Sequence, residues 1–179
     1  MASNVLIVDA SKHGTTREVA ESIARTLGER GLVVEIEEAR RVRDISRYDV
    51  VVVGGGLYVG KWHVDARRLL KRHRKEFAAK RLAVFGMGPD SLEESTVAEA
   101  RKQLDRALAA TPELEPIAVT VFGGALEPEN WRFPFNRLPA FDARDWNAIQ
   151  GWAEDLVETL RLAPTAVRAV EPRAGSISR

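Results

Sequence analysis

The first candidate for chemistry is a short loop rich in hydroxyl groups, from Ser11 to Thr16 (SKHGTT). A phosphate group needs N–H and O–H donors that converge on it, and a glycine lets the backbone approach closely. A helical pattern begins at Thr15, so the same residues could instead cap a helix. The loop follows the first predicted strand, however, and open α/β sheets bind ligands at the carboxyl ends of their strands. This position favours a phosphate site.

Two better-known phosphate motifs do not fit the sequence. No G-x-G-x-x-G follows the first predicted strand, so the dinucleotide fingerprint is missing. The stretch from Gly55 to Lys61 matches G-x-x-x-x-G-K, but Trp62 stands where a P-loop needs Ser or Thr to hold magnesium. It also follows an internal strand. The sequence therefore argues against an NTPase.

The composition of the chain limits which kinds of protein and which partners and sites it could have. The chain has 179 residues with 45% hydrophobic and 30% charged residues, which suits one domain. A formal net charge of +1 gives no reason to expect nucleic acid as a partner. There is no cysteine and there are three scattered histidines, so we predict no disulfide, iron–sulfur cluster, cysteine nucleophile or other metal site. With no signal-peptide pattern and no run of eighteen apolar residues, we expect a cytoplasmic protein with at most peripheral membrane contact.

Short β-branched runs alternate with helical patterns along the chain, which predicts a parallel sheet covered by helices on both faces. The predicted strands are Asn4–Asp9, Leu32–Glu37, Val50–Gly54, Leu82–Gly86 and Ile117–Phe122. The predicted helices are Thr15–Glu29, Val64–Phe77, Leu92–Ala110 and Asp142–Leu162, with one short helix between Ala39 and Asp49. We expect one domain over residues 1–162 and a flexible tail over 163–179, where Pro, Arg, Gly and Ser dominate.

Two further strand ends carry residues suited to a flat ligand. Strand three runs into a glycine-rich stretch, Gly54 to Trp62, and strand four into Gly86 to Ser91. A flavin ring needs a flat slot, polar groups at its pyrimidine edge and walls that exclude water. Glycines allow the close backbone approach that such a slot requires. The three loops together therefore suit a flavin with a terminal phosphate.

These loops resemble those of the flavodoxin family. The stretches Phe122–Leu126 (FGGAL) and Asp145–Ala153 (DWNAIQGWA) are more specifically similar to the branch that contains the menaquinone-dependent protoporphyrinogen oxidases. The resemblance covers Asn4 to about Leu162 and implies a flavodoxin-like α/β/α sandwich with a five-stranded parallel sheet of order 2-1-3-4-5. It also implies non-covalent binding of FMN. The flavin would then carry the chemistry, and we assign no catalytic side chain.

The resemblance assigns the cofactor to the ends of strands one, three and four. Tyr58 is the first choice for stacking on the flavin ring and Trp62 the second, although Trp62 suits packing against the next helix equally well. The carbonyl of Gly55 or Gly56 would face the flavin nitrogen that gains a proton on reduction. The predicted cofactor-binding residues are Ser11, Lys12, His13, Gly14, Thr15, Thr16, Gly55, Gly56, Leu57, Tyr58, Val59, Gly60, Trp62, Gly86, Met87, Gly88, Pro89 and Asp90.

The charges around this site depart from the acidic surroundings of many flavodoxins. Lys12, His13, Lys61 and His63 stand near the predicted flavin, with Asp90 as the clear acidic residue. Positive charge stabilises the reduced flavin, which carries negative charge, so we expect reduction to be easier than in an acidic flavodoxin.

The segment from Glu127 to Pro139 also departs from the protoporphyrinogen oxidases, in which the matching stretch is longer and more basic. Its shorter length and even charge weaken the case for porphyrin as a substrate. Trp131, Phe133 and Phe135 either wall a flat acceptor site, fold onto their own core or contact a second protomer.

A basic run lies between Lys61 and Arg81, with nine Lys and Arg residues against Asp65 and Glu76. It is either a solvated helix face or a docking surface for an acidic redox partner or an anionic membrane. We therefore predict an FMN oxidoreductase that passes electrons to a quinone-like acceptor. The alternatives are a flavodoxin-type carrier that docks partner proteins, and a flavin-free scaffold or regulator that uses the basic helix. A homodimer is compatible with each.

Overall fold

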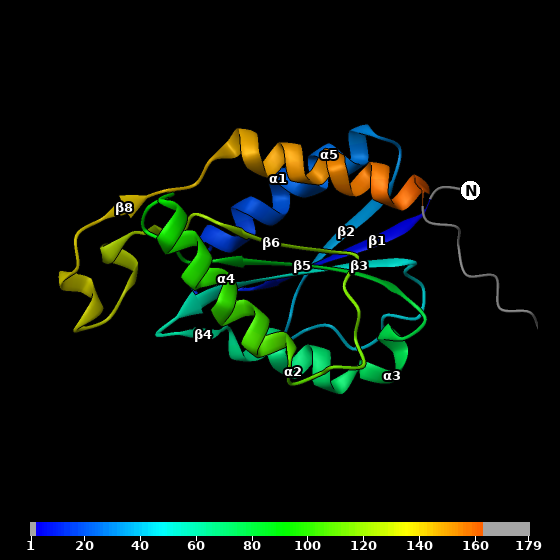
Figure 1. Ribbon diagram of the computed structural model, residues 1–179, viewed down its shortest axis with the longest axis horizontal. Coiled ribbons are helices and arrows are strands. Elements are labelled where there is room, and N and C mark those ends of the chain that lie inside the picture. The colour runs from blue at the N-terminus through cyan, green and yellow to red at the C-terminus, as the bar shows by residue number, and fades with distance from the viewer. Residues whose placement is uncertain (1–2, 163–179) are drawn as a thin grey trace, which may run out of the picture.

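Five parallel strands form the central sheet of the computed structural model, which describes residues 3–162 (Figure 1). Their order is β2-β1-β3-β5-β6, and a short strand β4 pairs antiparallel with the end of β3. Counted along the five parallel strands, this is the predicted order 2-1-3-4-5. The strands are β1 (Asn4–Ala10), β2 (Val33–Glu38), β3 (Val50–Tyr58), β4 (Lys61–Trp62), β5 (Arg81–Met87) and β6 (Ala118–Phe122).

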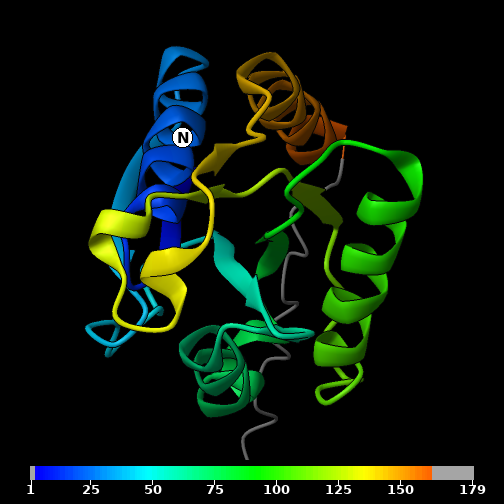
Figure 2. The same cartoon turned by 90° about the vertical axis from the view of Figure 1, so that its left-hand side faces the viewer.

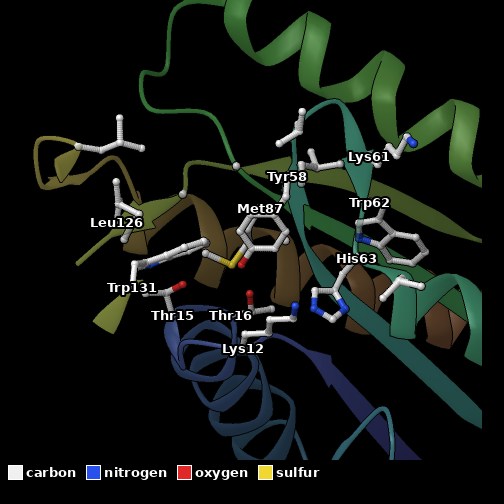
Figure 3. Close-up of a pocket in the computed structure, with 18 of the residues that line it drawn as sticks. Lys12, Thr15, Thr16, Tyr58, Lys61, Trp62, His63, Met87, Leu126 and Trp131 are labelled. Atoms are coloured by element: carbon white, nitrogen blue, oxygen red, sulfur yellow. The ribbon is translucent and has the colours of Figure 1, made fainter. Parts of the chain in front are cut away.

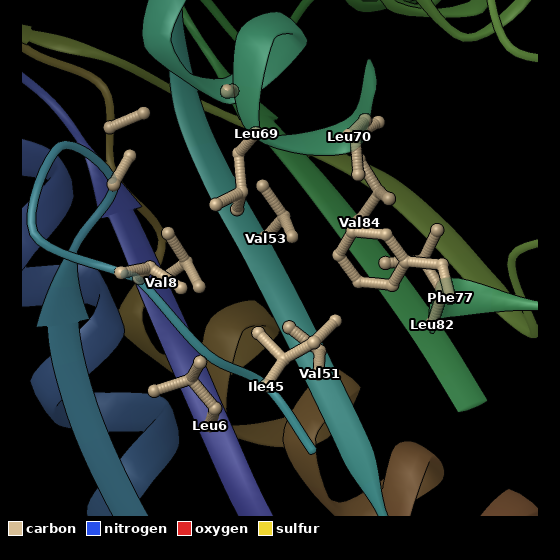
Figure 4. Packing of buried hydrophobic residues seen from close by; sticks show 14 of the residues in the cluster. Leu6, Val8, Ile45, Val51, Val53, Leu69, Leu70, Phe77, Leu82 and Val84 are labelled. Atoms are coloured by element: carbon tan, nitrogen blue, oxygen red, sulfur yellow. The ribbon is translucent and has the colours of Figure 1, made fainter. Parts of the chain in front are cut away.

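The middle of the sheet is buried on both faces. The four valines from Val50 to Val53 have no exposed surface, as expected for an inner parallel strand. Val51 and Val53 belong to one apolar cluster and Val50 and Val52 to the other, because successive side chains of a strand point to opposite faces. Figure 4 shows the first cluster, in which Val51 and Val53 lie beside residues from β1, β5 and α2 (Val64–Arg72).

Helices cover both faces and complete the three layers. Figures 1 and 2 show α1 (Thr15–Glu29) and α5 (Trp146–Leu162) on one face, and α2, α3 (Arg74–Phe77) and α4 (Glu94–Leu108) on the other. Helix α1 shows why these segments fold locally, since its apolar residues Val19, Ile23 and Leu27 recur at helical spacing and are buried. The chain turns away just after the helix at Gly31, whose φ of +88° suits glycine, and the Leu32 amide closes the helix end by donating to the Leu27 carbonyl at 3.2 Å.

The predicted short helix between β2 and β3 is wrong. Residues 39–49 contain no helix and form turns joined by irregular chain, and Val42, Ile45 and Tyr48 are buried in the first cluster. The segment must run from the carboxyl end of β2 to the amino end of β3, the full length of the sheet. About 11 residues in a helix would span only about 16 Å, whereas an extended chain reaches about twice that. The connection therefore has to be extended.

Other boundaries also differ from the prediction. The helix expected over Val64–Phe77 is divided at His73 into α2 and α3, and α5 begins at Trp146. Before α5, the chain forms a small antiparallel pair of β7 (Ala125–Leu126) and β8 (Phe141–Asp142), with two 3₁₀ turns between them, η1 (Pro128–Asn130) and η2 (Phe135–Arg137). Within residues 3–162, no helix is long and apolar enough to cross a bilayer. The tail predicted from residue 163 lies outside the described residues.

Candidate functional site

A cavity of about 470 Å³ lies at the carboxyl edge of the sheet, where β1, β3 and β5 end. Figure 3 shows its side chains converging from the loop after β1, the start of α1, the β3–β4 hairpin, the end of β5 and the segment that carries Trp131. The lining residues are Lys12, Thr15, Thr16, Gly56, Leu57, Tyr58, Val59, Lys61, Trp62, His63, Val64, Arg67, Met87, Gly88, Gly124, Ala125, Leu126, Trp131, Leu138 and Phe141.

The predicted phosphate loop leads into the N-terminus of α1 at one end of this cavity. Gly14 holds a φ of +84°, a left-handed conformation that glycine adopts without strain, and it has no side chain with which to cap the helix. Figure 3 shows the hydroxyl ends of Thr15 and Thr16 at the cavity, although both residues are otherwise buried. A helix N-terminus with hydroxyl groups beside it is suited to an anion.

The glycine-rich stretch after strand three continues the strand and then turns back as a hairpin. Leu57 pairs with Trp62 and Tyr58 with Lys61, so the turn is formed by two residues, Val59 and Gly60. Both have positive φ, +48° for Val59 and +75° for Gly60, as a type I′ hairpin turn requires. Valine rarely adopts this conformation, so Val59 is strained, and it is 89% exposed at the tip.

Tyr58 places its ring inside the cavity. The ring lies over Gly56, where a Cβ would overlap it, so the glycine is required for this position. It contacts His63 edge-on with the ring centroids 6.0 Å apart, and Trp131 at 5.6 Å and a tilt of 57°. Burial raises the pKa of Tyr58, so the phenol is uncharged at neutral pH.

Trp62 belongs to the core and forms only a wall of the cavity. Its side chain is 1% exposed and packs in the cluster under α2. Its indole Nε1–H donates to the Gly55 carbonyl at 3.0 Å, and the His63 amide donates to the Gly56 carbonyl at 2.8 Å. The two carbonyls suggested for the flavin nitrogen therefore each accept a hydrogen bond within the hairpin.

His63 is held in one tautomer at the start of α2. Its ring is 4% exposed, and Nδ1 accepts the Asp65 amide N–H at 3.2 Å, which caps the helix. Burial lowers the pKa of His63, so the ring is neutral at neutral pH. The expectation that His63 adds positive charge to the site is therefore wrong, because the sequence shows the residue type but not its burial.

Two buried polar atoms at this edge of the sheet have no hydrogen-bond partner within residues 3–162: His63 Nε2 and Asp9 Oδ1. Asp9 ends β1 and is 5% exposed. Burial raises its pKa, although a hydrogen bond with the Ser11 side chain acts in the opposite direction.

The end of β5 supplies the next wall through Met87 and Gly88. A Cβ on Gly88 would lie 2.8 Å from the Leu57 Cβ, so glycine lets this loop approach the hairpin. The Gly124 amide donates to the Pro89 carbonyl at 2.7 Å and joins the loop to the chain that follows β6. The next predicted residue, Asp90, does not line the cavity.

The segment from Pro128 to Leu138 closes the side opposite His63 (Figure 3). Trp131 stacks on His13 with the ring centroids 3.9 Å apart and an interplanar angle of 25°. Phe133 instead faces outward, 69% exposed, with the Arg137 guanidinium over its ring at 5.1 Å. The side chain of Phe135 lies outside the part of the chain that the structure describes.

The structure brings together ten of the predicted cofactor residues on the cavity wall. These are Lys12, Thr15, Thr16, Gly56, Leu57, Tyr58, Val59, Trp62, Met87 and Gly88. The other eight do not line it, and they are Ser11, His13, Gly14, Gly55, Gly60, Gly86, Pro89 and Asp90.

Sequence reasoning left a second group of lining residues out of the cofactor set. It comprises Lys61, His63, Val64, Arg67, Gly124, Ala125, Leu126, Trp131, Leu138 and Phe141. The signal for part of it was present, because β6 ends at the same sheet edge and leads into the FGGAL motif.

Comparisons with known proteins agree with this geometry. The profile of the family described as Flavodoxin domain matches residues 6–137. The chain belongs to the flavodoxin domain family. It is 25% identical over 135 residues to protoporphyrinogen IX dehydrogenase [quinone] of Escherichia coli K12, a match that covers 72% of each chain.

Solved flavodoxins share the fold. The Streptococcus pneumoniae TIGR4 flavodoxin superposes with a TM-score of 0.55 at 22% identity, covering 87% of this chain and 99% of the other. Oxidised flavodoxin 1 from Bacillus cereus gives a TM-score of 0.54 at 16% identity, covering 87% of this chain and 98% of the other. These likenesses confirm the predicted flavodoxin-like α/β class and its strand order.

Proposed function

We propose that this flavodoxin-domain protein binds FMN in the cavity and transfers electrons to a quinone-like acceptor. The observation that carries the proposal is one cavity that combines two kinds of lining. The α1 N-terminus with Thr15 and Thr16 is suited to an anion, and the rings of Tyr58 and Trp131 beside it are suited to a flat ligand. A volume of about 470 Å³ lies within the range of cofactor pockets.

The residues present fit the group. The start of α1 and Lys12 would hold the phosphate, while Tyr58, Met87 and Leu57 would enclose the ring. When bound, FMN supplies the electron-transfer chemistry. The chain orients the flavin ring and excludes water from it. The similarity of this chain to protoporphyrinogen IX dehydrogenase [quinone] supports a quinone-like acceptor at the open side of the cavity.

The test is whether the purified protein binds FMN and then reduces a quinone with multiple turnovers. A flavin absorbance band, or saturable binding of added FMN by calorimetry, is expected. FAD should bind more weakly, because a loop rich in hydroxyl groups at a helix N-terminus suits a terminal phosphate. A colourless protein that ignores added FMN would contradict the proposal and favour a flavin-free scaffold.

A carrier that docks an acidic partner protein is the second candidate, because the basic face of α2 adjoins the cavity. Lys61 and Arg67 line the cavity, and Arg68 and Lys71 continue outward as exposed residues of the same region. Such a face would steer an acidic partner to the flavin edge. Steady-state reduction of a soluble quinone by the isolated holoprotein would favour the enzyme, and its absence the carrier.

A further inference from the structure

The ring of His63, a residue that lines the cavity, carries a fixed and buried hydrogen-bond donor. A backbone N–H can only donate, so Nδ1, which accepts the Asp65 amide at 3.2 Å, carries no proton. In the neutral ring the proton is therefore on Nε2. Nε2–H is buried and has no acceptor within residues 3–162, although the side chain lines the cavity.

An unpaired buried donor of this kind costs free energy unless something pairs with it. The Asp65 carboxylate is no candidate, because its Oδ2 lies 3.7 Å from the other nitrogen, Nδ1, and pairs with Arg40 Nε at 2.7 Å. Tyr58 meets the ring only edge-on, with centroids 6.0 Å apart. Asp9 Oδ1 also lacks a hydrogen-bond partner within residues 3–162, but Asp9 is not among the charges that act on the His63 ring. A group that enters the cavity would supply the missing acceptor.

The chemistry around His63 indicates what that group is. Figure 3 shows the Lys12 side chain reaching toward the His63 ring, and the Lys12 charge acts on the ring electrostatically. Two donors thus lie side by side, on the same side of the cavity as Thr16 and the start of α1. An anion with several acceptor oxygens would satisfy both donors.

We infer that His63 Nε2–H donates a hydrogen bond to a phosphoryl oxygen of the ligand, beside Lys12, and so selects a ligand with a terminal phosphate. This inference rests on the proposed function, since it names FMN as the phosphate-bearing ligand. The donor is neutral and pre-set, because the cap on α2 fixes the ring before the ligand arrives. The residue is a ligand-positioning residue and takes no part in electron transfer.

Two substitutions test the roles of the two ring nitrogens of His63 separately. His63→Asn keeps an oxygen near the position of Nδ1, so it preserves the cap, but it removes the donor at Nε2. His63→Gln places an amide N–H near the position of Nε2 and loses the cap. Each variant is titrated with FMN and with riboflavin, which lacks the phosphate, and its thermal unfolding is recorded.

We expect His63→Asn to weaken FMN about 10- to 100-fold, the range for a hydrogen bond to a charged group, and to leave riboflavin unchanged. His63→Gln should bind FMN within about threefold of wild type despite a lower unfolding temperature. Wild-type FMN affinity in His63→Asn would overturn the inference, as would an equal loss of FMN and riboflavin. If the wild-type protein ignored FMN, the proposed function itself would fail together with the inference, so the two failures are distinguishable.

Discussion

The two walls of the cavity are built differently. The sheet-edge wall, formed by the ends of β1, β3 and β5 with the start of α1, lies on strands buried on both faces. The segment wall, residues 127–141, lies on 3₁₀ turns and a two-residue strand, and most of its side chains are exposed. Rigid elements hold a cofactor in place, whereas exposed connections can vary without loss of the fold. Under the proposed function, the cofactor is expected at the first wall and acceptor access at the second.

The largest effect is expected from filling the space behind the sheet-edge wall. In Gly54→Ala, the new Cβ would overlap the Phe85 ring, which is itself enclosed by Phe122 and Trp152 with ring centroids 5.7 and 6.2 Å away. Because the ring has no room to move, we expect a loss of about 3 kcal/mol in the free energy of unfolding. Urea denaturation measures it.

Two control variants are compared with Gly54→Ala in the same urea denaturation measurement. Phe133→Ala, in the segment wall, should change the free energy of unfolding by about 0.5 kcal/mol or less, because its side chain is largely exposed. Gly28→Ala, within α1 with open space around it, should raise stability by about 0.5 to 1 kcal/mol. A loss from Phe133→Ala as large as that from Gly54→Ala would contradict the contrast between the walls.

The next effect concerns the anion-binding end. Replacing Thr15 and Thr16 together by Ala should weaken FMN binding by about 1 to 3 kcal/mol through lost hydroxyl donors, with the fold retained. Calorimetry with FMN measures this change, and riboflavin is the control that should bind as before. If FMN affinity stays unchanged, the phosphate lies elsewhere in the cavity.

The segment wall is tested by removing it. Replacing residues 128–138 by a short Gly/Ser linker should leave FMN affinity nearly unchanged and lower quinone turnover, because Trp131 and Leu138 are lost from the open side of the cavity. Dissociation of a dimer is the other expected result if the segment contacts a second protomer. Flavin affinity, turnover and solution mass are measured on one sample. A collapse of flavin affinity alone would place the segment in the cofactor site.

The sheet-edge wall was largely predictable from the sequence, whereas for the segment wall the sequence left three alternatives open. Parallel strands reveal themselves by apolar runs such as Val50–Val53, and topology then brings their carboxyl ends together whatever the loops do. Hairpin formation at Val59 and Gly60 was missed, because a valine at positive φ contradicts local preference. A place for Trp131 on the wall of an acceptor site was one of the alternatives stated from the sequence, but its contact with His13 was not predicted, since that contact joins segments far apart in sequence.

Protonation states were the least predictable feature. Lys61 and His63 look alike as basic residues in the sequence, but one is exposed and the other is buried at a helix cap. Burial decides whether a histidine is charged, and no short-range pattern encodes it. The same holds for Asp9, because burial is the main cause of the raised pKa of its carboxyl.

The smallest effect on the free energy of unfolding is expected at Asp9, where the direction of the change with pH is the test. Its folded-state pKa is raised above 3.8, chiefly by burial, so its favourable contribution is present below pH 3.8 and is lost as pH rises through the folded value. Asp9→Asn should therefore raise the free energy of unfolding at pH 7, and the gain should shrink toward pH 3.8. Asp44 is the matched control, because hydrogen bonds from the Ser46 amide and hydroxyl lower its pKa. Asp44→Asn should lower stability at pH 7 and lose that effect in acid. Urea denaturation at several pH values compares the two, and shifts of the same sign in both variants would show that the Asp9 carboxyl is not held buried behind the sheet-edge wall.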